Sequence, residues 1–259
     1  MAKATRSNQR KVSTPKRDTG APSKDLIRDL VTANHILFQQ GVLDGFGHVS
    51  VRHDKDPTKF LLARNMAPAL VTAADILIFD LDGRPVSSKA PSVYLERFIH
   101  SEAYKARGDV QAVVHSHSKA VIPFGVVPEV SLQPIFHMGA FLGEGCPIFE
   151  IRDAGGPGCD LLIRSAELGA SLARDLGSHS AILMRGHGAT IVADALKRAV
   201  FRSVYMQMNA ELQTTALGLG RVNYLTTEEA RAATATVEGQ IQRAWDMWEI
   251  MSRNLGFRK

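Results

Sequence analysis

The sequence predicts an α/β protein. Apolar runs of four to six residues, bounded by turn signals, alternate along the chain with segments in which apolar residues recur every three or four positions. The first pattern is typical of strands and the second of amphipathic helices. Hydrophobic residues make up 45% of the chain and charged residues 22%, as in soluble globular proteins. No apolar run approaches the roughly 18 residues of a membrane-spanning helix, so no membrane partner is expected.

The length of 259 residues suits one domain, expected over residues 23–259, with long helices at its C-terminal end. Residues 1–22 carry six of the 31 Lys and Arg residues and one of the 26 Asp and Glu residues. Such a basic tail can bind nucleic acid, but it is so poor in large apolar residues that we expect disorder instead. Cys146 and Cys159 are expected to be free thiols, and the chain lacks a signal-peptide core, so the sequence favours a cytoplasmic protein.

The first half of the domain is expected to begin with a helix at 24–40, with Ser23 as its N-cap and Gly41 at its end. A second helix is expected over 92–107, and it contains both Glu96 and His100. Between these helices the predicted strands are Gly47–His53, Phe60–Ala63 and Ile76–Phe79.

The second half continues the alternation. A loop is expected at Asp153–Asp160, where Gly155, Gly156 and Gly158 surround Pro157. The predicted strands are Ala112–His117, Pro147–Ile151, Ala181–Met184 and Ala189–Val192. The predicted helices are Ala120–Val126, Ser165–Leu176, Asp194–Gly218 and Thr227–Asn254, the last preceded by a Thr226/Glu229 capping box.

The segment Ala112–His117 holds the first candidate metal ligands. Side chains alternate across a strand, so His115 and His117 point to the same side. Two imidazoles on one face can bind one divalent cation, and imidazole suits Zn, Fe, Mn or Ni. Alone, a pair with this spacing is more often structural.

Two further features favour the metal site. His187 lies between Gly186 and Gly188, and glycines on both sides of a histidine indicate a tight turn with close backbone approach. Glu96 precedes His115 by nineteen residues, within the predicted helix. Three histidines and one carboxylate make an open metal site with an acid–base partner.

The order Glu96, His100, His115-Ser116-His117, Arg185-Gly186-His187-Gly188 resembles the class II aldolase/adducin family. Residues Gly47–Arg52 resemble the early Gly-Asn-x-Ser-x-Arg strand of that family, and the resemblance covers roughly residues 25–220. It implies a three-layer αβα fold with a central, largely antiparallel mixed sheet. It also implies one divalent metal per subunit, Mn or Zn favoured over Fe, held by His115, His117 and His187.

The resemblance implies further that Glu96 is an acid–base residue or a displaceable fourth ligand. His100, one helical turn after Glu96, is expected to pack behind it. The resemblance also implies a ring of four subunits with an active site at each subunit boundary. A homotetramer is therefore expected, in which residues after Gly220 complete the neighbouring site.

The sequence departs from the sugar-phosphate aldolases of the family at their anion-binding positions. Tyr94-Leu95 stands where those enzymes place two serines, and His48 replaces the strand asparagine. The segment Ala63-Arg64-Asn65-Met66 lacks the hydroxyl and glycine of their phosphate turn. A phosphate needs several N–H or O–H donors or clustered cations, so a sugar-phosphate substrate is not expected.

The side chains at these positions are aromatic, apolar or cationic, which suits a substrate with a flat ring that bears carboxylates. His48, Tyr94, Arg64 and Arg52 are the candidate substrate contacts, and His137 is expected nearby. Gly47–Arg52 together with Lys89-Ala90-Pro91 resembles the aromatic-acid branch of the family. That branch includes decarboxylases of hydroxylated phthalates and of 3-hydroxy-2-methylpyridine-4,5-dicarboxylate.

The resulting hypothesis is a metal-dependent decarboxylase of aromatic catabolism, in which the metal accepts electron density. Arg64 or Arg52 would hold a second carboxylate, although either could be a structural strand-end residue. Glu96 or His137 would protonate the ring carbon. The alternatives are a retro-aldol lyase on a non-phosphorylated hydroxy acid, a non-haem iron aromatic oxygenase and a non-catalytic adducin-like module.

Overall fold

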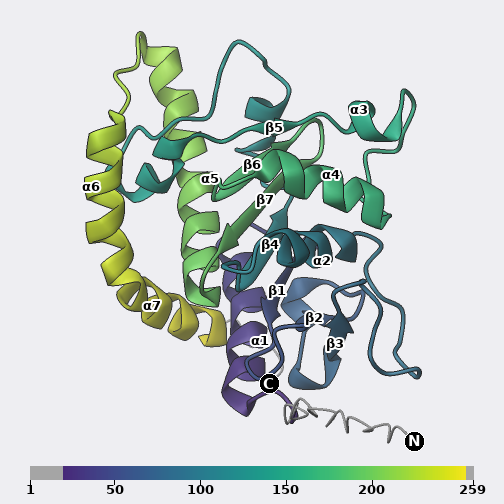
Figure 1. Ribbon diagram of the computed structural model, residues 1–259. Coiled ribbons are helices and arrows are strands. Elements are labelled where there is room, and N and C mark those ends of the chain that lie inside the picture. Colours follow the sequence, from purple (N-terminus) through teal and green to yellow (C-terminus); the bar gives the residue numbers. More distant parts are fainter. Residues whose placement is uncertain (1–19, 255–259) are drawn as a thin grey trace, which may run out of the picture.

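The computed structural model describes residues 20–254. These residues form one mixed β-sheet with helices on both of its faces (Figure 1). The strand order is β3-β2-β1-β4-β7-β6-β5, and every neighbouring pair is antiparallel except β5 and β6. The strands are β1 His48–Arg52, β2 Lys59–Ala63, β3 Ile76–Asp80, β4 Ala112–Ser116, β5 Ile148–Phe149, β6 Ala181–Met184 and β7 Gly188–Ala193. The expected α/β class and largely antiparallel mixed sheet are confirmed. Residues 1–19 of the predicted basic tail lie outside the described residues.

Two hydrophobic cores flank the sheet. In β4, Ala112 and Val114 face the core formed with α1, α5 and α7, whereas Val113 faces the core formed with α2 and α4. Alternation along a strand explains this division, since successive side chains point to opposite faces. The helices are α1 Lys24–Gln39, α2 Arg97–Ala106, α3 Ile151–Gly155, α4 Ala166–Leu176, α5 Leu196–Leu219, α6 Thr227–Val237 and α7 Ile241–Asn254.

Several helix ends follow local sequence chemistry. The Ser23 and Ser165 hydroxyls accept hydrogen bonds from backbone N–H groups in the first turns of α1 and α4. Thr226 and Glu229 form the predicted capping box of α6. These caps confirm the corresponding predictions.

Several predicted elements need correction. The helix predicted over 120–126 is a short 3₁₀ helix, Ile122–Gly125. Helix α2 begins at Arg97, so Glu96 is its N-cap residue and lies outside the helix. The strand predicted over 147–151 is only Ile148–Phe149, and α3 takes in residue 151 and residues 153–155 of the predicted loop. Residues His137–Glu144 form a 3₁₀ helix. The predicted final helix is interrupted by a short 3₁₀ segment, Glu238–Gln240, that separates α6 from α7. Gly239, a weak helix former, lies at the interruption.

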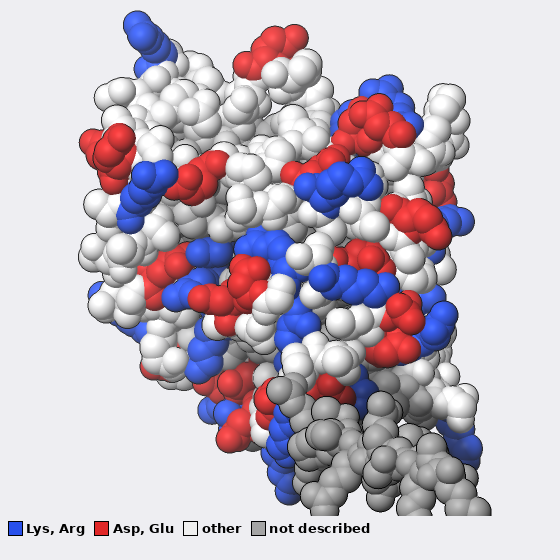
Figure 2. All heavy atoms as spheres, viewed as in Figure 1, with Lys and Arg blue, Asp and Glu red and all other residues white. Residues whose placement is uncertain are grey.

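The surface drawn in Figure 2 carries intermixed basic and acidic side chains, with no continuous patch of either sign. Among residues 20–254, no helix is both long and apolar enough to cross a bilayer.

Candidate metal centre

The end of β4 carries the first two ligands. His115 lies within the strand and is fully buried, and His117 follows one residue after the strand ends. The imidazole Nε2 atoms of His115 and His117 are 3.1 Å apart. The two histidines therefore converge as the strand pattern predicted.

The third histidine comes from the turn between β6 and β7. Gly186 has φ +67°, a conformation that favours glycine. Gly188 lies so close to β4 that a Cβ atom there would be 2.0 Å from the Ser116 carbonyl oxygen. This tight turn brings His187 Nε2 to 3.0 Å from His117 Nε2.

The carboxylate of Glu96 completes the cluster from the opposite side. Its Oε2 atom is 3.5 Å from Nε2 of both His115 and His187. Its Oε1 atom accepts a hydrogen bond of 2.9 Å from the backbone N–H of Ile163. Burial raises the pKa of Glu96, but hydrogen bonds and charge interactions with the two histidines outweigh burial, so this pKa lies well below its ordinary value. Glu96 is therefore ionised at neutral pH.

The donor set fits a divalent metal ion. One ligand atom from each of the four residues lies within 4.8 Å of all the others. In a tetrahedral zinc site with Zn–N bonds of about 2.0–2.1 Å, ligand atoms lie about 3.3 Å apart, close to the distances observed. Burial lowers the pKa of His115, and burial together with the neighbouring imidazoles lowers that of His117 to about 4. Neutral imidazoles and an ionised carboxylate are the protonation states that metal binding requires.

Backbone carbonyls orient two of the rings. His115 Nδ1 is 3.2 Å from the Ala189 carbonyl oxygen, and His187 Nδ1 is 2.9 Å from that of Leu161. Each Nδ1–H can donate to its carbonyl, which leaves Nε2 free for a metal. Leu161 has φ +66°, the single positive φ of a non-glycine residue among those described. The loop before α4 thus positions His187 through Leu161 and Glu96 through Ile163.

A wall of imidazole and phenol rings borders the cluster. His48 is paired with His115 across β1 and β4, with ring centroids 5.1 Å apart. The His48 ring lies 4.6 Å from that of Tyr94, whose hydroxyl donates a 2.5 Å hydrogen bond to the Met66 carbonyl. Burial raises the pKa of Tyr94 to about 12. These two predicted substrate contacts are therefore beside the cluster.

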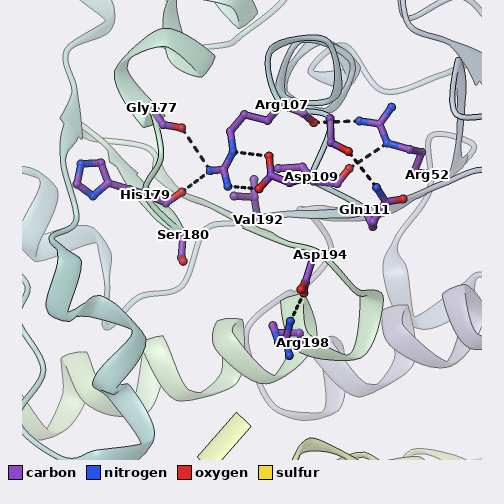
Figure 3. Close-up of polar contacts among 12 residues, drawn as sticks. Arg52, Arg107, Asp109, Gln111, Gly177, His179, Ser180, Val192, Asp194 and Arg198 are labelled. Carbon is purple, nitrogen blue, oxygen red and sulfur yellow. Dashed lines mark hydrogen bonds and ion pairs between the residues drawn. The ribbon is translucent and has the colours of Figure 1, made fainter. Parts of the chain in front are cut away.

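Arg52 is placed elsewhere. It is 6% exposed, and its guanidinium donates hydrogen bonds to the carbonyls of Pro57, Tyr104, Arg107 and Val110. Figure 3 shows Arg52 beside Arg107, which bridges Asp109 and the Gly177 and His179 carbonyls. Arg52 is four residues from His48 along β1, about 13 Å at the usual strand rise. It acts as a structural clamp at the far end of the strand.

The remaining predicted contacts differ in their surroundings. Arg64 uses Nε for a 2.7 Å ion pair with Asp75, and its side chain is 40% exposed. Its two Nη atoms have no hydrogen-bond partner among the described residues. His137 is exposed at the start of the 3₁₀ helix, next to Phe136, and is not part of the four-ligand cluster.

A cavity of about 290 Å³ opens beside His117. Lys119 is the cationic side chain of its lining, and Gln207 accepts a hydrogen bond from Ser118. Other lining residues are Gly41, Val42, Leu43, Asp44, Ala120 and Glu211. The sequence reasoning missed Lys119, Leu161 and Ile163. Only Lys119, two residues after His117, could have been found from its position in the chain.

Known proteins share both sequence and fold with this chain. It is 34% identical over 250 residues to decarboxylase tropJ of Talaromyces stipitatus, across 88% of this chain and 94% of that protein. A 3,4-dihydroxyphthalate decarboxylase of Arthrobacter keyseri is 30% identical over 211 residues, 73% of this chain and 78% of the relative. The solved structure of L-fuculose 1-phosphate aldolase from Glaciozyma antarctica matches with a TM-score of 0.74 at 21% identity, over 93% of this chain and 98% of that one. This last likeness establishes a shared fold.

The family profile described as "Class II Aldolase and Adducin N-terminal domain" matches residues 28–214. This span contains Glu96 and the three clustered histidines, together with all seven strands of the sheet. The resemblance carried by these motifs is thereby confirmed: the chain belongs to the class II aldolase and adducin family.

Proposed function

We propose that the protein is a metal-dependent decarboxylase of a hydroxylated aromatic or pyridine dicarboxylate. The observation that carries this proposal is a coincidence of two features. Similarity to two proteins named as decarboxylases extends over most of both chains, and all four candidate metal ligands are present and clustered. A carboxy-lyase uses such a site to stabilise the electron pair left when the carbon–carbon bond breaks.

The proposed metal is one divalent ion per subunit, Mn or Zn favoured, held by the Nε2 atoms of His115, His117 and His187. Bound there, it would supply a Lewis acid that draws electron density from the ring as CO₂ leaves. Glu96 is the proposed acid–base residue: its ionised carboxylate would accept the proton of the substrate hydroxyl and return it to the ring carbon, and Ile163 fixes its orientation. His137 stays a second prediction for this role.

The proposed substrate contacts are the side chains that border the metal cluster and the cavity beside it. Tyr94 and His48 offer flat surfaces for an aromatic ring, and the buried Tyr94 hydroxyl is already engaged with a backbone carbonyl. Arg64 is the proposed partner of a second carboxylate, because its Nη atoms remain available beyond the ion pair with Asp75. Lys119 is a further cation facing the cavity beside His117.

Decarboxylation can be tested with purified protein loaded separately with Mn²⁺, Zn²⁺ and Fe²⁺. We expect CO₂ release from 3,4-dihydroxyphthalate or a 3-hydroxypyridine-4,5-dicarboxylate, and none from phthalate, which lacks the hydroxyl. Glu96→Gln preserves shape but removes the titrating group, so it should keep the metal and lower kcat by roughly 100-fold or more. His137→Ala tests the second proton donor in the same assay.

Two outcomes would contradict the proposal. Aldehyde formation from hydroxy acids without CO₂ release would indicate a retro-aldol lyase. Failure of all three metal-loaded forms to decarboxylate the panel, in protein with bound metal, would exclude this substrate class. A Glu96→Gln variant as active as the unmodified protein would remove Glu96 from the chemistry while leaving the activity itself in place.

A further inference from the structure

A chain of buried hydrogen bonds runs from helix α2 to His48, behind the metal cluster. His48 Nδ1 is 2.6 Å from His100 Nε2, and His100 Nδ1 is 2.7 Å from Ser50 Oγ. Ser50 Oγ is also 2.7 Å from the Tyr104 hydroxyl oxygen. None of these four side chains is more than 4% exposed, so they are hydrogen-bonded to one another rather than to bulk water.

Two sequence periodicities bring the four residues together. His48 and Ser50 alternate with Val49 along β1, and their side chains therefore leave the same face of the sheet. His100 and Tyr104 lie one turn apart on α2, which covers that face. The motif containing His48 and the helix containing His100 thus form one polar unit within an otherwise apolar core.

Burial disfavours a charged imidazole, and the hydrogen bonds of His48 and His100 go to each other and to Ser50 rather than to a carboxylate. Both rings are therefore neutral. A neutral imidazole carries one proton, so one ring nitrogen donates and the other accepts. Only two arrangements of protons satisfy the 2.6 Å contact between the rings.

Tyr104 decides between these arrangements. Among the described residues, Ser50 Oγ is the single hydrogen-bond partner of the Tyr104 hydroxyl. If Ser50 donated to Tyr104, the Tyr104 proton would be buried without an acceptor, which is unfavourable. Tyr104 therefore donates to Ser50. The Ser50 proton then has His100 Nδ1 as its remaining partner among the described residues, so Ser50 donates to His100 Nδ1. His100 Nε2–H in turn donates to His48 Nδ1. The proton of His48 is then left on Nε2.

We propose that Tyr104, Ser50 and His100 are positioning residues that hold His48 in its Nε2–H tautomer, as a fixed hydrogen-bond donor at the wall of the metal site. His48 Nε2 has no hydrogen-bond partner among residues 20–254, but it is not one of the fully buried unpartnered atoms of these residues, so its proton can reach solvent or a substrate, which the Tyr104 proton cannot. The His48 ring neighbours those of Tyr94 and His115. A fixed donor selects a substrate that places an oxygen acceptor there, and it excludes His48 from acting as a base. That the acceptor is a carboxylate or phenolate oxygen rests on the proposed function.

The tautomer can be measured by ¹⁵N NMR of protein containing ¹⁵N-labelled histidine and Zn²⁺, which is diamagnetic. His48→Gln identifies the His48 signals among those of the nine histidines. We expect a pyrrole-like Nε2 and a pyridine-like Nδ1 for His48. A pyridine-like Nε2 in the unmodified protein would overturn the proposal directly, without reference to any variant.

Variants then test whether the chain sets the tautomer. Tyr104→Phe and Ser50→Ala should each move the ¹⁵N chemical shift of His48 Nε2 towards the pyridine-like range. Either change removes a hydrogen bond that fixes which nitrogen of His100 carries the proton. Ser203→Ala is the matched control, since Ser203 is a buried serine on α5 whose hydroxyl donates to the Ala199 carbonyl, away from the His48 chain. If the His48 signals stay unchanged in a folded Tyr104→Phe protein and in a folded Ser50→Ala protein, the chain does not position His48. Tyr104→Phe changes one atom, so the test survives if Ser50→Ala does not fold.

An activity measurement separates this inference from the proposed function. His48→Phe removes the donor, whereas His48→Gln retains an N–H group. With a substrate that is decarboxylated, His48→Phe should lower kcat/KM at least about tenfold more than His48→Gln does. Equal losses in the two variants would refute the donor role. If no aromatic acid is decarboxylated, the proposed function fails, and the NMR result still decides the tautomer.

Discussion

At the scale of single residues, three of the four candidate metal ligands are oriented by a backbone group that their own spacing does not reveal. His115 and His187 each face a backbone carbonyl through Nδ1, and Glu96 is held by the N–H of Ile163. Such partners fix tautomer and ring orientation and raise ligand basicity. These contacts hold three of the candidate ligands in place without a metal, so loss of one ligand should not disturb the others.

We accordingly expect His115→Ala, His117→Ala and His187→Ala each to lose bound metal while keeping the far-UV circular dichroism of the unmodified protein. Elemental analysis after dialysis should give well under one ion per chain. His179→Ala is the control, because His179 lies outside the cluster and should leave metal content unchanged. The ligand assignment is wrong if two of the three variants retain full metal content.

The clustering of the histidines could be predicted from the sequence, because residue spacing determines which side chains of a strand share a face. The two-residue step from His115 to His117 and the glycines around His187 needed only strand and turn geometry. The partners from the loop before α4 could not be predicted. Backbone groups carry no sequence signal, and the left-handed φ of Leu161 contradicts local preference. Arg52 lies at the far end of β1, and sequence alone does not separate an arginine that binds a substrate from one that satisfies buried carbonyls.

At the scale of elements, the approach of β7 to β4 is what brings His187 to the His115–His117 pair. The two strands are antiparallel neighbours, and Thr190 lies opposite His115. Gly188 marks the closest approach, where Ser116 and His117 occupy the space a side chain would need. The expected role of the glycine turn is confirmed, whereas the exact start of α2 after Glu96 was not predicted because helix ends depend on tertiary contacts.

Gly188→Ala should therefore lower both stability and metal affinity. The new Cβ would be 2.0 Å from the Ser116 carbonyl oxygen and 3.2 Å from His117 Cα, and neither backbone atom can move cheaply. We expect a loss of about 1–3 kcal/mol in the free energy of unfolding, measured by urea denaturation, and weaker metal retention. Gly218→Ala is the matched control: nothing lies within 4 Å of its Cβ position on α5, so a gain of about 0.5–1 kcal/mol is expected. Equal effects of the two substitutions would contradict the close-approach argument.

At the scale of the whole molecule, exposed apolar side chains gather on the helices of the C-terminal third. Met208, Leu212 and Leu219 recur on one face of α5, and Met247, Ile250 and Met251 recur on one face of α7. Each is at least 40% exposed. Gln207 and Glu211, which line the cavity beside His117, directly precede Met208 and Leu212. The cavity thus opens next to the apolar stripe of α5, the face that Met208, Leu212 and Leu219 share.

Apolar surface of this kind usually marks an interface, and we predict a homotetramer in which each stripe borders a neighbouring subunit's site. A closed cyclic ring would cover it with one repeated heterologous contact. Sedimentation at micromolar concentration should show four chains. The double substitution Leu212→Glu and Ile250→Glu should give smaller, folded species with reduced decarboxylation, because the charges cannot be buried unpaired. Val86→Glu, at a residue 55% exposed after β3, should alter neither assembly nor activity. A fully active monomer would show that each chain carries a complete site, and the stripe would then need another partner.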